Sequence, residues 1–218
     1  MKPNNMNSRF RPRNGIVQRC KRAAALLCLY AFAAQPHAAP ITYTFSGIGS
    51  GQVFGGAFFN NAPFTISLSA DTDNVVPLLF PTHPELTAVI VDCSSSTFSI
   101  TGLGTGMFTV PTVVFDNLSL GALGFSVAVP AGLPSDVLDI KAPDFFSYGL
   151  TTSIGPVGPV DSSYLSFIMP TTLGNLALSS ASTISFDAVI VPEPSTILMV
   201  VGGAFLLLPR RICRTPKR

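Results

Sequence analysis

The chain has 218 residues and a formal net charge of +2, but its basic residues are confined almost entirely to the two ends. Residues 1–22 and 210–218 hold every Lys and Arg except Lys141, whereas residues 39–191 hold ten carboxylates and therefore carry one positive charge against ten negative charges. An acidic middle block offers no basic face, which excludes nucleic acid as its partner.

The first 38 residues have the layout of a secretory signal peptide. A basic stretch that ends with Lys21 and Arg22 precedes an apolar run over residues 23–34, and small residues follow at Ala38 and Ala39. The run is too short to span a bilayer stably, and small residues leave an extended backbone open to a peptidase. We expect an N-terminal signal helix, cleavage by signal peptidase after Ala38, and export.

Residues 191–218 read as a processing and anchoring tail. They comprise a proline motif, an apolar run and a basic stop, made of Val191, Pro192, Glu193 and Pro194, then Thr196, Ile197 and Leu198 through Leu206, Leu207 and Leu208, then Pro209, Arg210 and Arg211. The prolines end the preceding strand, the apolar run enters a bilayer as a C-terminal transmembrane helix, and the arginines stay on the cytoplasmic side. Thirteen helical residues reach about 20 Å against a hydrocarbon core of about 30 Å, so we expect shallow, bilayer-thinning or transient insertion.

This tail resembles that of the PEP-CTERM proteins, a bacterial family with a Val-Pro-Glu-Pro motif, a transmembrane segment and a terminal arginine cluster. The match covers Val191 to Arg211, and it departs in its short apolar run and in Pro209 before the arginines. The resemblance implies recognition of Pro192, Glu193 and Pro194 by an exosortase, a membrane-embedded cysteine transpeptidase or protease. It also implies a Gram-negative source that makes extracellular polysaccharide.

The block between the ends predicts an all-β fold. Apolar residues alternate with Thr and Ser around Ile41, Phe64 and Ile184, which indicates strands with one solvated face. Further strands are expected at Val53–Phe59, Leu86–Asp92, Thr97–Thr101, Met107–Phe115, Leu123–Val129 and Tyr164–Met169. Pro-rich segments 130–143 and 155–160 are expected to be loops. The pattern favours an antiparallel β-sandwich over residues 39–190, for which a jelly roll is one fitting topology.

Candidate catalytic residues do not form a recognisable set. His83 is the one histidine left after signal removal, and no Gly-x-Ser-x-Gly elbow frames a nucleophile for it. Cys93 is the one thiol of the middle block, where a structural thiol is expected, and with His83 it gives no zinc-ligand spacing. We predict no catalytic residue, no cofactor and no metal.

Other motifs favour turns over ligand sites. Asp71-Thr72-Asp73-Asn74 opens like a calcium loop, but Val76 replaces the sharp-turn glycine and Thr82 the bidentate glutamate. Gly47–Gly51 and Gly102–Gly106 lack the lysine of a phosphate loop, so we expect hairpin turns at both. A non-EF-hand calcium site stays open as a hypothesis on Asp136, Asp139, Asp144 and Asp161.

Together these features predict a noncatalytic exported protein of the cell surface or extracellular matrix. On the PEP-CTERM resemblance it is held transiently in the inner membrane by its C-terminal helix, processed by an exosortase, and associated with exopolysaccharide or biofilm. The alternative is a lectin-like module that binds carbohydrate or calcium through loop carboxylates and exposed tyrosines.

Overall fold

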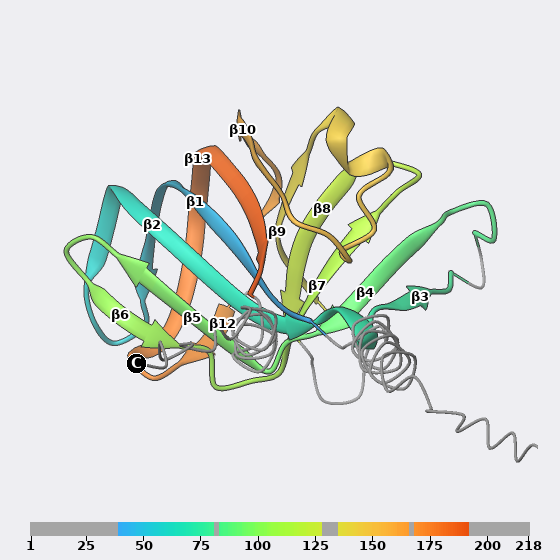
Figure 1. Ribbon diagram of the computed structural model, residues 1–218. Helices are drawn as coiled ribbons and strands as arrows, with labels where there is room; N and C mark the ends of the chain where they lie inside the picture. Colours follow the sequence, from blue (N-terminus) through green and yellow to red (C-terminus); the bar gives the residue numbers. More distant parts are fainter. Residues whose placement is uncertain (1–38, 81–82, 128–134, 166–167, 192–218) are drawn as a thin grey trace, which may run out of the picture. The chain divides into compact units, whose positions relative to one another are not determined.

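The computed structural model describes residues 39–80, 83–127, 135–165 and 168–191. Within these ranges the chain is all-β and forms one seven-stranded and one six-stranded antiparallel sheet, an arrangement consistent with the predicted sandwich (Figure 1). No helix in the described ranges has the length and apolar character needed to cross a bilayer. The predicted signal and transmembrane helices lie outside these ranges.

The larger sheet, called sheet A, has the order β10-β13-β1-β2-β5-β6, and β12 also pairs with β13. Its strands are β1 (Pro40–Val53), β2 (Phe58–Asp71), β5 (Ser95–Ile100), β6 (Gly104–Met107), β10 (Ile154–Val160), β12 (Ile168–Thr171) and β13 (Gly174–Ile190). Sheet B has the order β11-β9-β8-β7-β4-β3. Its strands are β3 (Val76–Leu78), β4 (Ala88–Asp92), β7 (Thr112–Asn117), β8 (Ala122–Val127), β9 (Ser135–Lys141) and β11 (Ser162–Leu165). Two short 3-10 helices, η1 (Thr72–Asn74) and η2 (Pro143–Phe146), complete the described elements.

The period-two pattern correctly identified the centre of sheet A. Ile41, Tyr43 and Phe45 of β1 are fully buried, whereas the intervening Thr42 and Thr44 are half-buried. Because successive strand residues point to opposite faces, alternation places every second side chain in the core and the others toward solvent. The same alternation aligns β1 with β2 on one side and with β13 on the other.

Aromatic rings join the two sheets in one core. Phe45 of β1 packs against Phe125 of β8 with ring centroids 5.7 Å apart. Phe186 of β13 is fully buried and has four aromatic neighbours, namely Tyr43, Phe45, Phe145 and Tyr148. Tilted and edge-on ring pairs of this kind add stabilisation beyond the area they bury, so Phe186 lies at the packing centre.

The prediction of a loop at 155–160 is wrong, because these residues belong to β10. This strand pairs with β13 through Ile154, Val157 and Val160, one residue in three. Pro156 and Pro159 lie between these paired residues, so the N–H groups that they lack are not needed for pairing with β13. Edge strands are where a sheet tolerates proline.

The prediction of a loop at 130–143 is also wrong over Ser135–Lys141, which form β9. The prolines of this segment flank the strand in the sequence and do not interrupt it. Val137, Leu138 and Ile140 are buried, so β9 contributes to the core that the proline content had obscured.

Three predicted strands have the wrong extent. Val53–Phe59 contains the turn between β1 and β2, where Gly55 adopts a φ of +79°. Met107–Phe115 is divided between β6 and β7. Tyr164–Met169 is divided between β11 of sheet B and β12 of sheet A.

The hairpin turn expected at Gly47–Gly51 is wrong. The one expected at Gly102–Gly106 is confirmed between β5 and β6, but the turn occupies residues 101–103, and Gly104 and Gly106 already belong to β6. Gly47 and Gly51 lie inside β1, beside register shifts in its pairing with β13. A Cβ on Gly51 would lie 2.1 Å from the carbonyl oxygen of Ala177, so glycine is needed here for close backbone approach.

Candidate functional site

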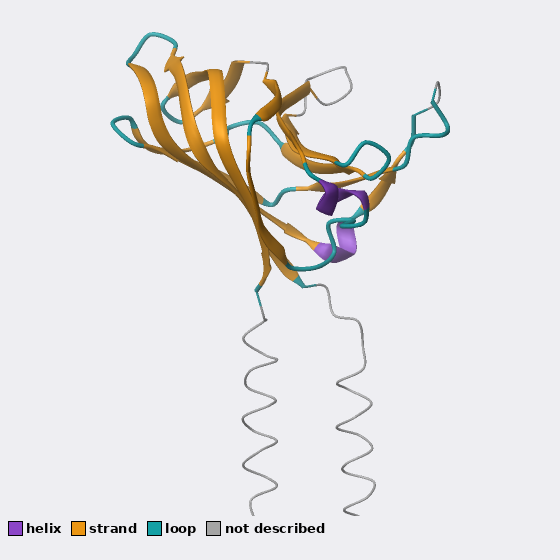
Figure 2. Ribbon diagram, turned by 90° about the horizontal axis from the view of Figure 1, so that it is seen from above, coloured by secondary structure: helices purple, strands orange, loops and turns teal. Residues whose placement is uncertain are grey.

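The described chain begins and ends on neighbouring strands. Ile41 of β1 is paired with Ile190 of β13, and the backbone N–H of Val191 donates to the carbonyl oxygen of Pro40 at 2.8 Å. Figure 2 shows the two ends of the described chain side by side. Pro192 follows in the sequence and has no N–H with which to continue this ladder. The expected signal-peptide cleavage after Ala38 and the start of the expected sorting motif at Val191 therefore adjoin the same end of sheet A.

The remaining residues of the predicted tail lie outside the described ranges. They are Pro192, Glu193 and Pro194, the membrane residues Thr196, Ile197, Leu198, Leu206, Leu207 and Leu208, and the basic stop Arg210 and Arg211. Their roles stay predictions from the sequence.

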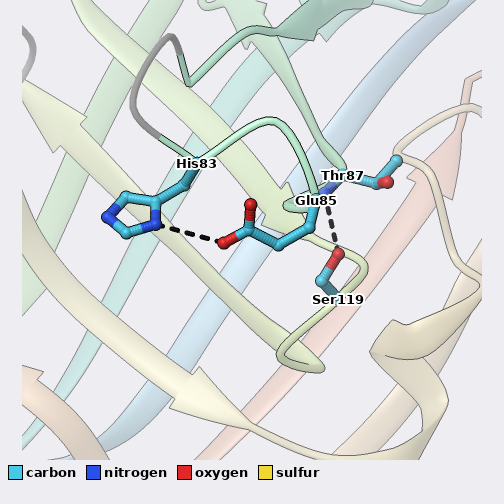
Figure 3. A network of polar contacts seen from close by, with 4 residues as sticks. All are labelled: His83, Glu85, Thr87 and Ser119. Atoms are coloured by element: carbon cyan, nitrogen blue, oxygen red, sulfur yellow. Dashed lines mark hydrogen bonds and ion pairs between the residues drawn. The ribbon is translucent and has the colours of Figure 1, made fainter.

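His83 lies in an exposed loop beside an acid. Its Nδ1 is 3.1 Å from Oε1 of Glu85, and the two side chains are 63% and 66% exposed (Figure 3). The nearby hydroxyl of Ser119 accepts a hydrogen bond from the backbone of Thr87 at 2.7 Å. Among the described residues no serine is hydrogen-bonded to His83, so this cluster does not have the geometry of a nucleophile and its base.

The calcium-like sequence Asp71–Asn74 forms a turn. Oδ1 of Asp71 accepts the backbone N–H of Asp73 at 3.0 Å and caps η1. The carboxylate is thus used as a helix cap. This use is what the turn interpretation predicts.

The four aspartates of the calcium hypothesis have separate surroundings. Asp136 and Asp139 share strand β9, and Oδ1 of Asp136 accepts the hydroxyl of Ser126 at 2.7 Å. Asp144 lies in η2, and Asp161 accepts the backbone N–H of Thr183. The described part of the chain contains no group of three or more His, Cys, Asp or Glu arranged to hold a metal ion.

Asp139 is nevertheless electrostatically unusual. Its pKa is raised to about 7, chiefly by burial and also by the nearby Asp136 carboxylate, while Lys141 opposes the shift. Its Oδ1 is buried without a hydrogen-bond partner among the described residues. A carboxyl in such surroundings favours the protonated form more than an exposed one does.

Cys93 is a half-buried free thiol. Burial raises its pKa to about 11, although hydrogen bonds from the Thr112 side chain and the Val114 backbone oppose the shift. A raised pKa leaves little thiolate at neutral pH. This environment agrees with the structural role expected from the sequence.

A buried polar group in the core escaped the sequence analysis. Asp116 is fully buried, and its Oδ2 accepts the backbone N–H of Gly149 at 3.0 Å. Its Oδ1 and the buried hydroxyl of Tyr148 have no hydrogen-bond partner within the described ranges. Burial raises the pKa of Asp116 to about 6, and the bond from Gly149 opposes this shift.

The loop that contains Gly149 is also held by the buried side chain of Tyr43. The Tyr43 hydroxyl donates to the carbonyl oxygen of Leu150 at 2.7 Å, and burial raises the pKa of Tyr43. Gly149 and Leu150 have φ values of +71° and +63°, and Leu150 is fully buried. Asp116 and Tyr43 therefore hold a backbone conformation that is unfavourable for leucine.

The outer face of sheet A is covered by hydroxyl side chains, and we call it the hydroxyl face. Paired residues of antiparallel strands share a face, so the register arranges these side chains in rows across the strands. One row is Asp187, Thr44, Ser67, Thr97 and Met107; the next is Ser185, Ser46, Thr65, Ser99 and Thr105; the third is Val189, Thr42, Ser69 and Ser95. Asp187 is the only charged side chain in these rows.

An open hollow lies at one edge of the hydroxyl face, between β10 and β13. Its volume is about 560 Å³, and it is lined by Ile154, Pro156, Asp187 and Val189 among others. Gly155 sits so close that a Cβ on it would lie 2.9 Å from the Cα of Asp187. No ion pair or side-chain hydrogen bond within the described ranges engages the Asp187 carboxylate, which leaves its oxygens available to a ligand.

No protein-family model matches this chain, and comparisons with curated proteins and with solved structures find no significant match. The structure itself defines the class of protein, which is an all-β protein with two antiparallel sheets.

Proposed function

We propose that this chain is a noncatalytic exported protein of the cell surface or extracellular matrix. In this proposal signal peptidase removes residues 1–38, the sandwich acts outside the cell, and a transmembrane helix at 196–208 holds the chain transiently in the inner membrane. An exosortase then processes the tail at Pro192, Glu193 and Pro194. The mature protein associates with extracellular polysaccharide.

The observation that carries the proposal is the position of the expected motif directly after the last described backbone pairing of sheet A. Backbone pairing continues to Val191, whose N–H bonds Pro40, and the expected recognition motif starts at the next residue. A processing enzyme requires extended, accessible backbone, and Pro192 has no N–H with which to extend the pairing that Val191 makes with β1. The apolar run starts two residues after Pro194, so the motif also lies close to the membrane in sequence.

The noncatalytic assignment rests on the separate surroundings of the candidate groups. His83 and Glu85 are solvent-exposed, Cys93 has a raised pKa, and Asp116 is sealed in the core. Nucleophilic or acid–base catalysis needs such groups within hydrogen-bond reach of one another and of a substrate.

Fractionation of a tagged chain in its native host tests the proposal. The wild-type chain is expected in the envelope or medium, and replacement of Pro192, Glu193 and Pro194 by alanine should retain an unprocessed form in the inner membrane. Alanine at Ser162, Ser163 and Tyr164, within the sandwich, provides a control that leaves the tail intact. Cytoplasmic wild-type protein, or unchanged fractionation of the motif variant, would contradict the proposal.

The alternative function, a lectin-like module, is favoured by one observation. The hydroxyl face carries a shallow, open hollow in which the Asp187 carboxylate lies beside apolar side chains, the two kinds of surface that a sugar ring presents in return. This function is compatible with tail processing, because the hydroxyl face and the end of β13 are different parts of sheet A.

A further inference from the structure

The hydroxyl face restricts the chemistry of any partner that covers it. Its rows consist almost wholly of Ser and Thr side chains, with Asp187 as the one charge and Val189 and Met107 at the margins. A partner that buried this face would have to hydrogen-bond the hydroxyls, because a buried polar group left unpaired is costly. An apolar surface is therefore a poor fit.

The negative charge of the described residues makes an anionic polymer a second poor fit for the hydroxyl face. The described residues include ten carboxylates and one cation, Lys141, which lies on β9 of the other sheet. Nothing in the rows of the hydroxyl face would neutralise an anionic polymer, and Asp187 would repel one. The complementary partner is uncharged and rich in both hydroxyl donors and acceptors.

The hollow adds a more specific requirement. The Asp187 carboxylate can accept hydrogen bonds from two hydroxyls at once, while Ile154, Pro156 and Val189 supply apolar surface around it. A sugar ring has this combination of adjacent hydroxyls and a C–H face. The row Asp187, Thr44, Ser67 and Thr97 then continues from the hollow across four adjacent strands, at about 4.8 Å per strand.

We infer that the hydroxyl face binds a neutral polysaccharide, with one sugar ring in the Asp187 hollow and the chain continuing along the row of hydroxyls. This inference rests on the proposed function in one respect, since export brings the face into contact with extracellular polymer. It names the ligand class and the residues that the proposed function leaves open.

The test is affinity gel electrophoresis of the full-length chain, kept in a detergent without a sugar headgroup. The gels contain hydroxyethylcellulose, dextran or alginate, which are a β-linked neutral glucan, an α-linked neutral glucan and an anionic polymer. At least one neutral glucan should retard the wild-type chain, and alginate should not. Asp187→Asn should weaken that retardation about tenfold, because it removes a charge-assisted acceptor while conserving size.

Two further variants separate binding from folding. Thr44→Val removes a hydroxyl next to Asp187 and should also weaken retardation, whereas Asp92→Asn removes an exposed strand carboxylate of sheet B and should not. Thermal unfolding of each variant reports whether its fold is intact. Absence of retardation by both neutral glucans overturns the inference, as does stronger retardation by alginate or wild-type retardation of both Asp187→Asn and Thr44→Val.

The outcome is independent of tail processing. Export and processing of Asp187→Asn in cells should equal those of the wild type, so loss of glucan binding alone would leave the proposed function intact. Conversely, unchanged fractionation of the tail-motif variant together with normal glucan retardation would remove the proposed function and keep the binding face.

Discussion

The stability of the sandwich should fall as the pH rises through the titration range of Asp116. This carboxyl is fully buried, and its pKa is raised from 3.8 to about 6. The folded state therefore binds the proton more tightly than the unfolded state. The resulting stabilisation is fully present below pH 3.8 and is lost as the pH rises through 6.

The magnitude follows from the size of the shift. A change of one pKa unit corresponds to about 1.4 kcal/mol, so Asp116 should cost about 3 kcal/mol of unfolding free energy between acid and neutral pH. Asp139, whose pKa is raised to about 7, should add a smaller effect of the same sign because it is only partly buried.

Urea unfolding of the chain from Ala39 to Val191, followed by circular dichroism between pH 4 and pH 8, measures this dependence. Asp116→Asn keeps an acceptor for the N–H of Gly149 and removes the titration, so most of the pH dependence should disappear. Asp92→Asn, an exposed control, should leave it unchanged. Wild-type stability that rises from pH 4 to pH 7, or an Asp116→Asn variant with the full wild-type dependence, would refute the reasoning.

Three other changes follow from contacts in the fold. Gly51→Ala should destabilise the sandwich by about 1–3 kcal/mol, because its Cβ would meet a β13 carbonyl oxygen at 2.1 Å, whereas Gly56→Ala, with nothing nearer than 3.5 Å, should be nearly neutral in the same urea assay. Tyr43→Phe should cost about 1–3 kcal/mol by leaving the buried carbonyl of Leu150 without its donor, and an unchanged unfolding midpoint would contradict this. Cys93 should react with a disulfide reagent at pH 8 about a hundredfold more slowly in the folded than in the unfolded chain, and equal rates would show that the thiol is accessible and ionised.

The positions of the central strands were predictable from the sequence because one face of sheet A is exposed to solvent and the other is buried. Alternation around Ile41, Phe64 and Ile184 reports directly which side chains enter the core, and it needs no knowledge of pairing. Strands β9 and β10 were not predictable in this way. Prolines flank β9 and lie within β10, so their density suggested loops at both; in β10 they are tolerated because the strand lies at the edge of sheet A, a position that only the assembled sheet defines.

The candidate sites also combine features that the local sequence shows with features that only the assembled fold defines. The Ser and Thr positions of each strand are visible in the sequence, but the hydroxyl face depends on β1 lying beside β13, and these strands are far apart along the chain. Asp116 had a weak local signal, since it follows Val114 by two residues and so shares its inward direction. The partner of Asp116, the backbone N–H of Gly149, comes from a distant loop that no local pattern identifies.

The intact mass of the mature protein from its native host tests export and tail processing most directly. The predicted chain starts at Ala39 and lacks the basic C-terminal end, with any group added at the tail appearing as extra mass. A mass corresponding to the whole sequence from Met1 to Arg218, with both ends retained, would contradict the assignment of this protein as processed cargo of the cell surface.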